Sequence, residues 1–258
     1  MEEESEMSNM PEPILIMELG LHGEGELDYH KRIVDGLVSW WPGWPNIVVK
    51  TQSWFDTDSP WVQEMRRCHG RMPLRALPAN AHRQLSNYCR DRGLLYGVTM
   101  HDEASFEMLD MMALDYAKLG SFDATNENLV KLLASNTNRT GYPRPIWSEG
   151  IVNGPDWISR KLACANRYPA NVSFISLCRG HRKATGERQY GYSCHSVPKL
   201  AIQEVTEAAK FGCHTLEVHV TARPPRVRPL PADYCVSLSV YQFARVARKL
   251  GQIWSKEA

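Results

Sequence analysis

The chain has 258 residues, of which 43% are hydrophobic and 23% are charged, and it contains 17 Gly and 16 Pro. A chain of this length and apolar content can bury a full core, which excludes wholesale disorder and a fibrous architecture. No apolar run approaches the roughly 20 residues of a membrane helix, and the acidic N-terminus lacks the pattern of a signal peptide. We therefore expect a soluble, cytoplasmic protein with no membrane partner.

The 30 basic and 29 acidic residues nearly balance, but residues 1–11 hold four Glu and no basic residue. We expect residues 1–11 to form a flexible acidic tail before a single domain over residues 12–258. The domain is then mildly basic, which suits an anionic small substrate as well as nucleic acid. The seven cysteines are scattered without a C-x-x-C pair, so we expect reduced thiols rather than disulfides or a zinc ribbon.

Short β-rich runs recur along the chain and predict eight strands. They cover residues 14–20, 47–52, 94–99, 116–121, 145–150, 173–178, 190–195 and 215–221. Helical periodicity separates most of these runs and is clearest over 27–41, 197–211 and 240–253. For the second of these helices, Ser196 is the candidate N-cap and Gly212 follows the C-terminal end.

Alternating strands and helices predict an α/β fold with a parallel sheet, and eight strands in about 250 residues predict a (β/α)8 TIM barrel. A doubly wound open sheet is the alternative. Two connections depart from the regular pattern: residues 53–80 are long and rich in Pro and Arg, and residues 179–189 are short and polar. Irregular loops of this kind often carry function.

Most predicted strands carry a polar or charged side chain near the C-terminal end. In a (β/α)8 barrel these ends meet at one mouth, where catalytic groups lie. The residues are Glu18, Lys50, Gln52, Thr99, Lys118, Ser121, Ser148, Glu149, Ser193, His195, Glu217 and His219. Their convergence predicts an active site at that mouth.

Each of these residues has a structural explanation when it is taken alone. A strand lysine such as Lys50 or Lys118 can extend to solvent, and His195 can be a core histidine. Glu217 and His219 can lie on the polar face of a half-exposed edge strand. Because polar side chains recur near the ends of seven predicted strands, a shared active site is favoured over separate structural explanations. The remaining histidines have no comparable placement and are expected to be surface or structural: His22, His30, His69, His82, His101, His181 and His214.

The residue types at this mouth suggest a chemistry. Imidazoles at 195 and 219 can bind a divalent metal ion that acts as a Lewis acid. Lysines at 50 and 118, with the Ser and Thr hydroxyls, supply the charge and donors that a phosphate and a carboxylate require. The basic loops 179–188 and 223–228 would add to this field, although a solvated charged loop is the more common explanation for such segments.

Five motifs, in order, resemble those of the sialic acid synthase family, which condenses phosphoenolpyruvate with N-acetylmannosamine. They are E-L-G at 18–20, V-K-T-Q at 49–52, Y-A-K-L-G-S at 116–121, G-Y-S-C-H at 191–195 and E-V-H-V-T at 217–221. The order and approximate spacing match over residues 14–250. The resemblance therefore implies a (β/α)8 barrel with small-molecule substrates, and it suggests a homodimer.

The resemblance also implies a role for each matching position. The catalytic residues would be Glu18, Lys50 and Glu217. The phosphoenolpyruvate site would comprise Lys50, Thr99, Lys118, Ser121, Ser148 and Ser193. Gln52 and Asp233 would contact the acceptor, and His195 and His219 would bind Mn²⁺ or Mg²⁺. Either Glu18 or Glu217 would handle the protons of the reaction, and only geometry can decide which.

The chain also departs from the family pattern. Cys194 stands where the family has an aspartate, and Glu149 stands where it has a threonine. The family's Asn and Tyr after strand six find no counterpart in C-R-G-H-R at 178–182. The sequence shows no counterpart of the family's C-terminal antifreeze-like domain, so we expect the barrel domain alone.

The sequence therefore predicts a metal-dependent transferase that joins phosphoenolpyruvate to a sugar aldehyde, with N-acetylmannosamine as one candidate. The product would be a 2-keto-3-deoxy sugar acid, released together with phosphate. One alternative keeps the barrel but makes the enzyme an aldolase or sugar isomerase. The other is a degenerate barrel used for binding, and near-neutral charge without a basic, aromatic groove makes nucleic acid the weaker candidate partner.

Overall fold

A computed structural model describes residues 12–20, 25–41, 43, 45–59, 62–63, 67, 76–137, 141–177, 191–222 and 232–256. The predicted tail at 1–11 and the basic loops 179–188 and 223–228 lie outside these residues, as do parts of the 53–80 connection. Three of the histidines expected to be surface or structural, at 22, 69 and 181, are also outside them.

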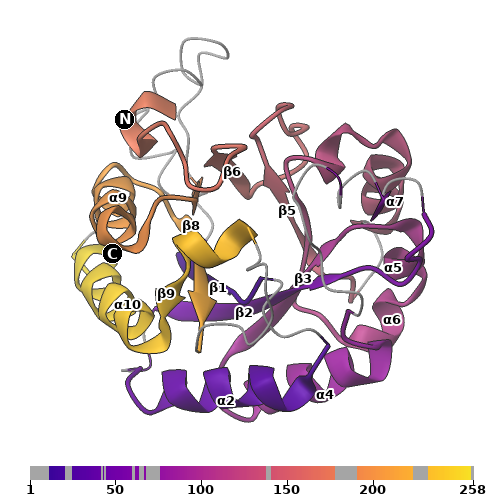
Figure 1. Cartoon of the computed structure of the whole chain (residues 1–258), viewed down its shortest axis with the longest axis horizontal. Helices are drawn as coiled ribbons and strands as arrows, with labels where there is room; N and C mark the ends of the chain where they lie inside the picture. Colours follow the sequence, from indigo (N-terminus) through magenta and orange to yellow (C-terminus); the bar gives the residue numbers. More distant parts are fainter. Residues whose placement is uncertain are drawn as a thin grey trace.

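Eight parallel strands form a closed sheet (Figure 1). They are β1 (Ile14–Glu18), β2 (Asn46–Ser53), β3 (Leu95–Met100), β4 (Tyr116–Leu119), β5 (Arg144–Ser148), β6 (Lys161–Cys164), β7 (Gly191–Cys194) and β8 (Thr215–Thr221). Each strand pairs with the next, and β8 also pairs with β1. This closure confirms the (β/α)8 barrel and excludes the doubly wound sheet. A short β9 (Leu238–Ser239) pairs with the end of β8.

Helices surround the strands (Figure 1). They are α2 (Leu27–Val38), α4 (Ala79–Arg90), α5 (Glu103–Glu107), α6 (Leu109–Met112), α7 (Glu127–Thr137), α9 (Pro198–Lys210) and α10 (Val240–Trp254), with 3-10 turns η1 (Asp123–Thr125) and η2 (Ala232–Val236). The three predicted helices are confirmed as α2, α9 and α10. None of the helices in the described ranges is long and apolar enough to cross a membrane.

The predicted cap of α9 is wrong. Val197 is the N-cap, and the Ser196 hydroxyl instead donates to Glu204 Oε2 at 2.7 Å. Gly212 does follow the end of α9, with a φ of 95° that a residue bearing a Cβ rarely adopts.

The predicted sixth strand is wrong. Residues 174–177 form one helical turn, and its Phe174 packs against Tyr192 and Phe211. The sixth strand is β6, whose sequence K-L-A-C contains no β-branched or aromatic residue and gives a weak strand signal. Pairing with β5 on one side and β7 on the other makes this segment a strand. The eight strands are therefore present, but one lies earlier in the chain than predicted.

Alternate residues of each strand face the barrel interior and the surrounding helices. Leu15 and Met17 of β1 belong to the large core between strands and helices. The interior holds a separate apolar cluster of Ile14, Ile16, Val48, Tyr116, Ile146 and Leu162. This cluster forms a floor, because the next inward residue on several strands is polar. A cavity above it therefore has an apolar base and polar walls.

One inward position must be glycine. A Cβ on Gly191 of β7 would collide with the carbonyl of Lys161 on the neighbouring strand. The missing side chain allows β6 and β7 to approach closely at the base of the barrel.

His82 of α4 is buried between the helix and the barrel. Its Nδ1 lies 2.7 Å from the Tyr96 hydroxyl. Burial, helped by the nearby charge of His30, lowers the pKa of His82 from 6.5 to about 3. Folded His82 therefore stays neutral at pH values where an unfolded chain would be protonated.

This buried histidine predicts acid sensitivity. Because the unfolded state binds the proton and the folded state does not, the free energy of unfolding falls as the pH drops from 6.5 toward 3. The contribution of one such group approaches about 1.4 kcal/mol per pH unit. The variant His82→Gln cannot titrate, so its unfolding free energy, measured by urea denaturation between pH 7 and pH 5, should depend less steeply on pH. Equal slopes for the two proteins would contradict the prediction.

Candidate active site

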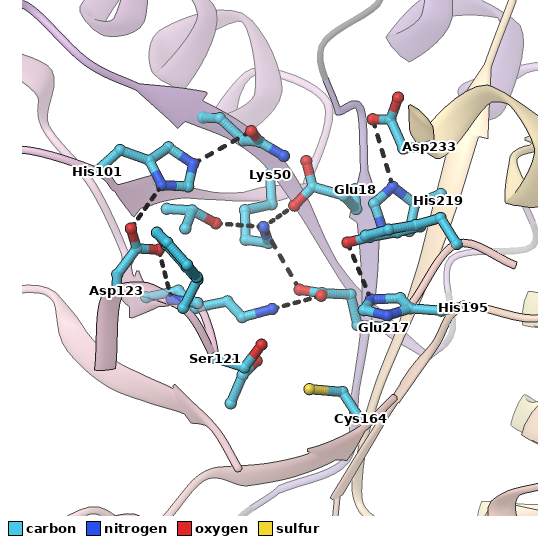
Figure 2. Close-up of a pocket in the computed structure, with 17 residues that line it drawn as sticks. Glu18, Lys50, His101, Ser121, Asp123, Cys164, His195, Glu217, His219 and Asp233 are labelled. Atoms are coloured by element: carbon cyan, nitrogen blue, oxygen red, sulfur yellow. Dashed lines mark hydrogen bonds and ion pairs between the residues drawn. The ribbon is translucent and has the colours of Figure 1, made fainter. Parts of the chain in front are cut away.

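A cavity opens at the carboxyl ends of the strands (Figure 2). Many of the polar residues predicted at this mouth line it. They are Glu18, Lys50, Gln52, Thr99, Lys118, Ser121, Ser148, His195, Glu217, His219 and Asp233. Side chains that are far apart in the sequence therefore share one cavity, and this juxtaposition is the geometry on which the predicted site depends.

Strand register explains the convergence. Glu18 pairs with Lys50 on one side and with His219 on the other, and Thr99 pairs with Lys118. Paired residues on neighbouring parallel strands point to the same face of the sheet. Closure of the barrel turns this face inward, so all five side chains point into the same space.

A chain of ion pairs crosses the centre of the cavity. Lys50 Nζ contacts the Glu18 carboxylate, donates to Thr99 Oγ1 at 2.6 Å and lies 3.5 Å from Glu217 Oε2. Lys118 Nζ donates to Glu217 Oε1 at 2.5 Å. Lys50 is 1% exposed and Lys118 is 5% exposed, so neither lysine extends to solvent. Two ammonium groups and two carboxylates thus balance one another in a buried space.

Burial and neighbouring charges shift the pKa values of the residues in this cluster in opposite directions. Burial lowers the pKa of Lys50 to about 7, against the attraction of Glu217. Burial by itself raises the pKa of Glu217, but the charges of Lys118 and Lys50 outweigh it and hold that pKa well below its ordinary value. Glu217 is therefore ionised at neutral pH and suited to accept a proton rather than give one.

Two predicted residues lie outside the cavity wall. The Ser193 hydroxyl donates to Glu217 Oε1 at 2.7 Å, so Ser193 holds this carboxylate in place from outside the wall. Glu149 Oε1 accepts a hydrogen bond from the Gly154 backbone at 2.9 Å. Strand β8 is paired on both sides, which excludes an edge strand for Glu217 and His219.

The imidazole rings of His195 and His219 form another part of the cavity wall. The ring centroids of His195 and His219 are 5.4 Å apart, and Tyr168 stacks on His195 at 4.3 Å. His195 Nδ1 donates to the Ala165 carbonyl at 2.6 Å. Burial, with the nearby charge of His219, lowers the pKa of His195 to about 3. The ring is therefore neutral, with its proton on Nδ1 and a lone pair on Nε2.

The donor set fits a divalent cation that takes its other ligands from substrate and water. Nε2 of His195 lies 3.3 Å from the Tyr168 hydroxyl, and His219 Nδ1, 3.7 Å from Asp233 Oδ2, is buried without a hydrogen-bond partner among the described residues. Two imidazoles with a carboxylate behind one of them are common around catalytic metals. Within the described ranges, no group of three His, Cys, Asp or Glu could hold a metal ion by itself.

The corrected position of β6 reveals residues that the sequence prediction missed. Cys164 at the end of β6 and Tyr168 shortly after it both line the cavity. Asn166 lies between them and donates to the Gly150 carbonyl. The expected absence of an Asn and a Tyr after strand six is therefore wrong: it resulted from placing that strand too late in the chain.

His101 and Asp123 are a second pair that the prediction missed. His101, expected to be surface or structural, lines the cavity, and so does Asp123 at the start of η1. A signal was present in the sequence, because His101 lies two residues after Thr99 and therefore faces the same side of β3. His30, His82 and His214 do not line the cavity.

Comparisons with known proteins agree with this geometry. The sequence model of the NeuB family matches residues 48–144, which span β2 to the start of β5. The family resemblance seen in the motifs is thereby confirmed. No curated protein matches the chain in sequence.

Solved structures share the whole barrel. An N-acetylneuraminic acid (sialic acid) synthetase from Leptospira borgpetersenii serovar Hardjo-bovis has a TM-score of 0.70 at 17% identity, over 96% of this chain and 86% of that one. A putative spore coat polysaccharide biosynthesis protein E from Chromobacterium violaceum has a TM-score of 0.74 at 15% identity, over 96% and 76%. A truncated 3-deoxy-D-arabino-heptulosonate 7-phosphate synthase from Thermotoga maritima has a TM-score of 0.63 at 14% identity, over 96% and 88%. At these identities the likeness establishes the fold.

The lowered pKa of Lys50 predicts pH-dependent anion binding. Sulfate keeps its charge at neutral and alkaline pH, so its affinity for the cavity should fall as Lys50 loses its proton above pH 7, approaching about tenfold per pH unit. Calorimetric titration between pH 6 and pH 9 measures this dependence. Lys50→Met should remove the pH dependence, whereas Lys131→Met on the exposed face of α7 should retain it. Sulfate binding that is independent of pH in the unsubstituted protein would contradict the prediction.

Proposed function

We propose that this protein condenses phosphoenolpyruvate with a sugar aldehyde to give a 2-keto-3-deoxy sugar acid and phosphate. The observation that carries this proposal is a single cavity in which two buried lysines and several hydroxyls lie beside a pair of imidazoles. The NeuB match and the synthases among the structural neighbours support the same reaction class.

The donor would bind deep in the cavity. Lys50 and Lys118 would pair with the phosphate and carboxylate of phosphoenolpyruvate, and Thr99, Ser121 and Ser148 would donate hydrogen bonds to the same groups. Both lysines are ion-paired with glutamates in the structure. The doubly anionic donor would therefore replace carboxylates as the counter-charge and hold the enol carbon in a defined place.

The acceptor would bind nearer the mouth, against Gln52 and Asp233. A divalent cation held by His195 and His219 would polarise the aldehyde oxygen and make the carbonyl carbon more electrophilic. Asp233, close to His219, would orient that ring. Tyr168, stacked on His195, would keep bulk water from this side of the cavity.

The proposed reaction forms one carbon–carbon bond and one carbon–oxygen bond, the latter from water, and breaks the carbon–oxygen bond between C2 and the phosphate. C3 of phosphoenolpyruvate attacks the aldehyde carbon, and the aldehyde oxygen takes up a proton as it becomes a hydroxyl. Water adds to the cationic C2 and loses a proton, which gives a tetrahedral intermediate. Collapse of this intermediate expels inorganic phosphate and leaves the keto group.

The two glutamates would divide the proton transfers. Glu217 is held ionised by Lys118 and Lys50, so it would accept a proton from the attacking water. Glu18 Oε1 accepts a hydrogen bond from the Gly20 backbone, and its other oxygen contacts Lys50. Binding of the donor to Lys50 would release this second oxygen of Glu18 for proton transfer at the aldehyde oxygen.

Phosphate release tests the proposed function directly. The protein, phosphoenolpyruvate and Mn²⁺ are incubated with N-acetylmannosamine, other aldoses and an aldose phosphate, and inorganic phosphate is measured. We expect release only when a suitable aldehyde is present. If no aldehyde in the panel gives release, the condensation is wrong and an aldolase or isomerase on the same barrel is favoured.

Glu18→Gln tests the proposed proton transfer. The amide keeps the size of the side chain but cannot exchange a proton, so kcat should fall by about 10²-fold or more while phosphoenolpyruvate still binds. Steady-state kinetics and calorimetry separate these two effects. Glu149→Gln, at the end of β5 but outside the cavity wall, is the matched control and should keep its activity. Full activity of Glu18→Gln would exclude this role.

His219→Ala tests the proposed metal site. Loss of one of two imidazole ligands should weaken Mn²⁺ binding by at least about tenfold and remove metal-dependent turnover. Electron paramagnetic resonance of free Mn²⁺ measures binding without relying on activity. His214→Ala, outside the cavity wall, is the control and should bind Mn²⁺ normally. Unchanged Mn²⁺ affinity in His219→Ala would refute the assignment.

A further inference from the structure

His101 connects two polar residues of the cavity wall. Its ring Nδ1 lies 3.0 Å from Asp123 Oδ1, and its Nε2 lies 3.1 Å from Gln52 Oε1. The Asp123 carboxylate can only accept, so Nδ1 of the ring donates to it, and the Gln52 amide makes the contact at the other ring nitrogen. Figure 2 shows His101 and Asp123 across the cavity from His195 and His219, with Lys50 between the two groups.

Asp123 holds one end of this connection rigidly. The side chain is 1% exposed, and Oδ2 accepts a hydrogen bond from the Gly120 backbone at 3.2 Å. A Cβ on Gly120 would lie 2.6 Å from that same oxygen, so glycine is required for the carboxylate to fit. A carboxylate fixed by the backbone fixes the His101 ring in turn, because a charge-assisted hydrogen bond is directional and strong.

At the other end of the connection, His101 sets the orientation of the Gln52 amide. Gln52 lies two residues beyond Lys50 on β2, on the same face and nearer the mouth of the cavity. With Oε1 bound to His101, the amide group must present Nε2 away from the ring. No residue in the described part of the chain accepts a hydrogen bond from Nε2. The two N–H groups of Gln52 therefore remain available to a ligand.

The contacts also exclude one role for His101. A general base needs a lone pair that reaches the substrate. Both ring nitrogens of His101 face protein oxygens, at 3.0 and 3.1 Å. The ring therefore acts on the substrate through Gln52.

We propose that His101 is a positioning residue for the acceptor, which turns the Gln52 amide so that Nε2 donates to an oxygen of the bound sugar. The acceptor class is a polyhydroxy aldehyde that presents a hydroxyl or carbonyl oxygen at this point. The inference rests on the proposed function, since only there is Gln52 an acceptor contact. Asp123 supports the ring, and the three side chains act as one unit: Asp123, His101 and Gln52.

Substitution of His101 separates acceptor binding from the other steps. His101→Phe keeps a ring but removes both ring nitrogens, so the KM for the acceptor should rise about tenfold, the equivalent of one lost hydrogen bond. The kcat and the KM for phosphoenolpyruvate should stay within about twofold, because a misplaced amide weakens ground state and transition state alike. His101→Gln retains one donor and should restore part of the acceptor affinity. His30→Phe, buried in α2 away from the cavity, is the control for loss of a histidine ring.

A double substitution tests whether His101 acts through Gln52. In a Gln52→Ala background, His101→Phe should cause no further rise in the acceptor KM. Additive effects of the two substitutions, or an equal loss for donor and acceptor in His101→Phe, would overturn the inference while leaving the proposed function intact.

A crystal structure of His101→Phe decides the inference without any activity. The Gln52 amide should leave its present position once the ring donor is lost, and an unmoved amide would overturn the proposal. Absence of phosphate release from the unsubstituted enzyme would instead refute the proposed function, so the two failures are distinguishable.

Discussion

The burial of two lysine side chains inside a closed barrel constrains the rest of this structure. Moving an ammonium group from water into a protein interior costs several kcal/mol unless carboxylates and hydroxyls surround it. Glu18 and Glu217 supply carboxylates around Lys50, and Glu217 also supplies one for Lys118. The two glutamates come from β1 and β8, the first and last strands of the barrel, which become neighbours only when the sheet closes. Closure of the fold and neutralisation of the lysines therefore depend on each other.

This arrangement explains why an apolar barrel can carry a polar site. The interior cluster around Tyr116 forms a packed floor, so the polar layer rests on a core that contributes stability by itself. Above it, the lysines and glutamates balance in charge, and a doubly anionic donor can exchange with the carboxylates without leaving a bare charge in the interior. In the proposed function, the glutamates would then become available for proton transfer at the point where substrate is bound. In a site of this kind, binding of the donor would change the charges around the two glutamates and so alter their reactivity.

The cavity has two functional sides. On one side, His195 and His219 present ring nitrogens beside Tyr168. On the other side, Asp123 and His101 form a chain of hydrogen bonds that ends at the amide of residue 52. In the proposed function, the first side would hold a cation and an aldehyde oxygen, and the second side would hydrogen-bond the acceptor. Together they would orient a sugar between a deep donor site and the solvent at the mouth.

The sequence by itself determined the fold class, the α2, α9 and α10 helices and most of the residues that line the cavity, because period-two alternation and polar strand ends are local patterns. It misplaced β6, since K-L-A-C has weak strand propensity and becomes a strand only through pairing with both neighbours. It also left out His101, whose importance depends on contacts with residues 52 and 123. Only the tertiary structure decided which carboxylate neutralises which lysine, because that choice depends on strand register and barrel closure. A single strand cannot encode either property.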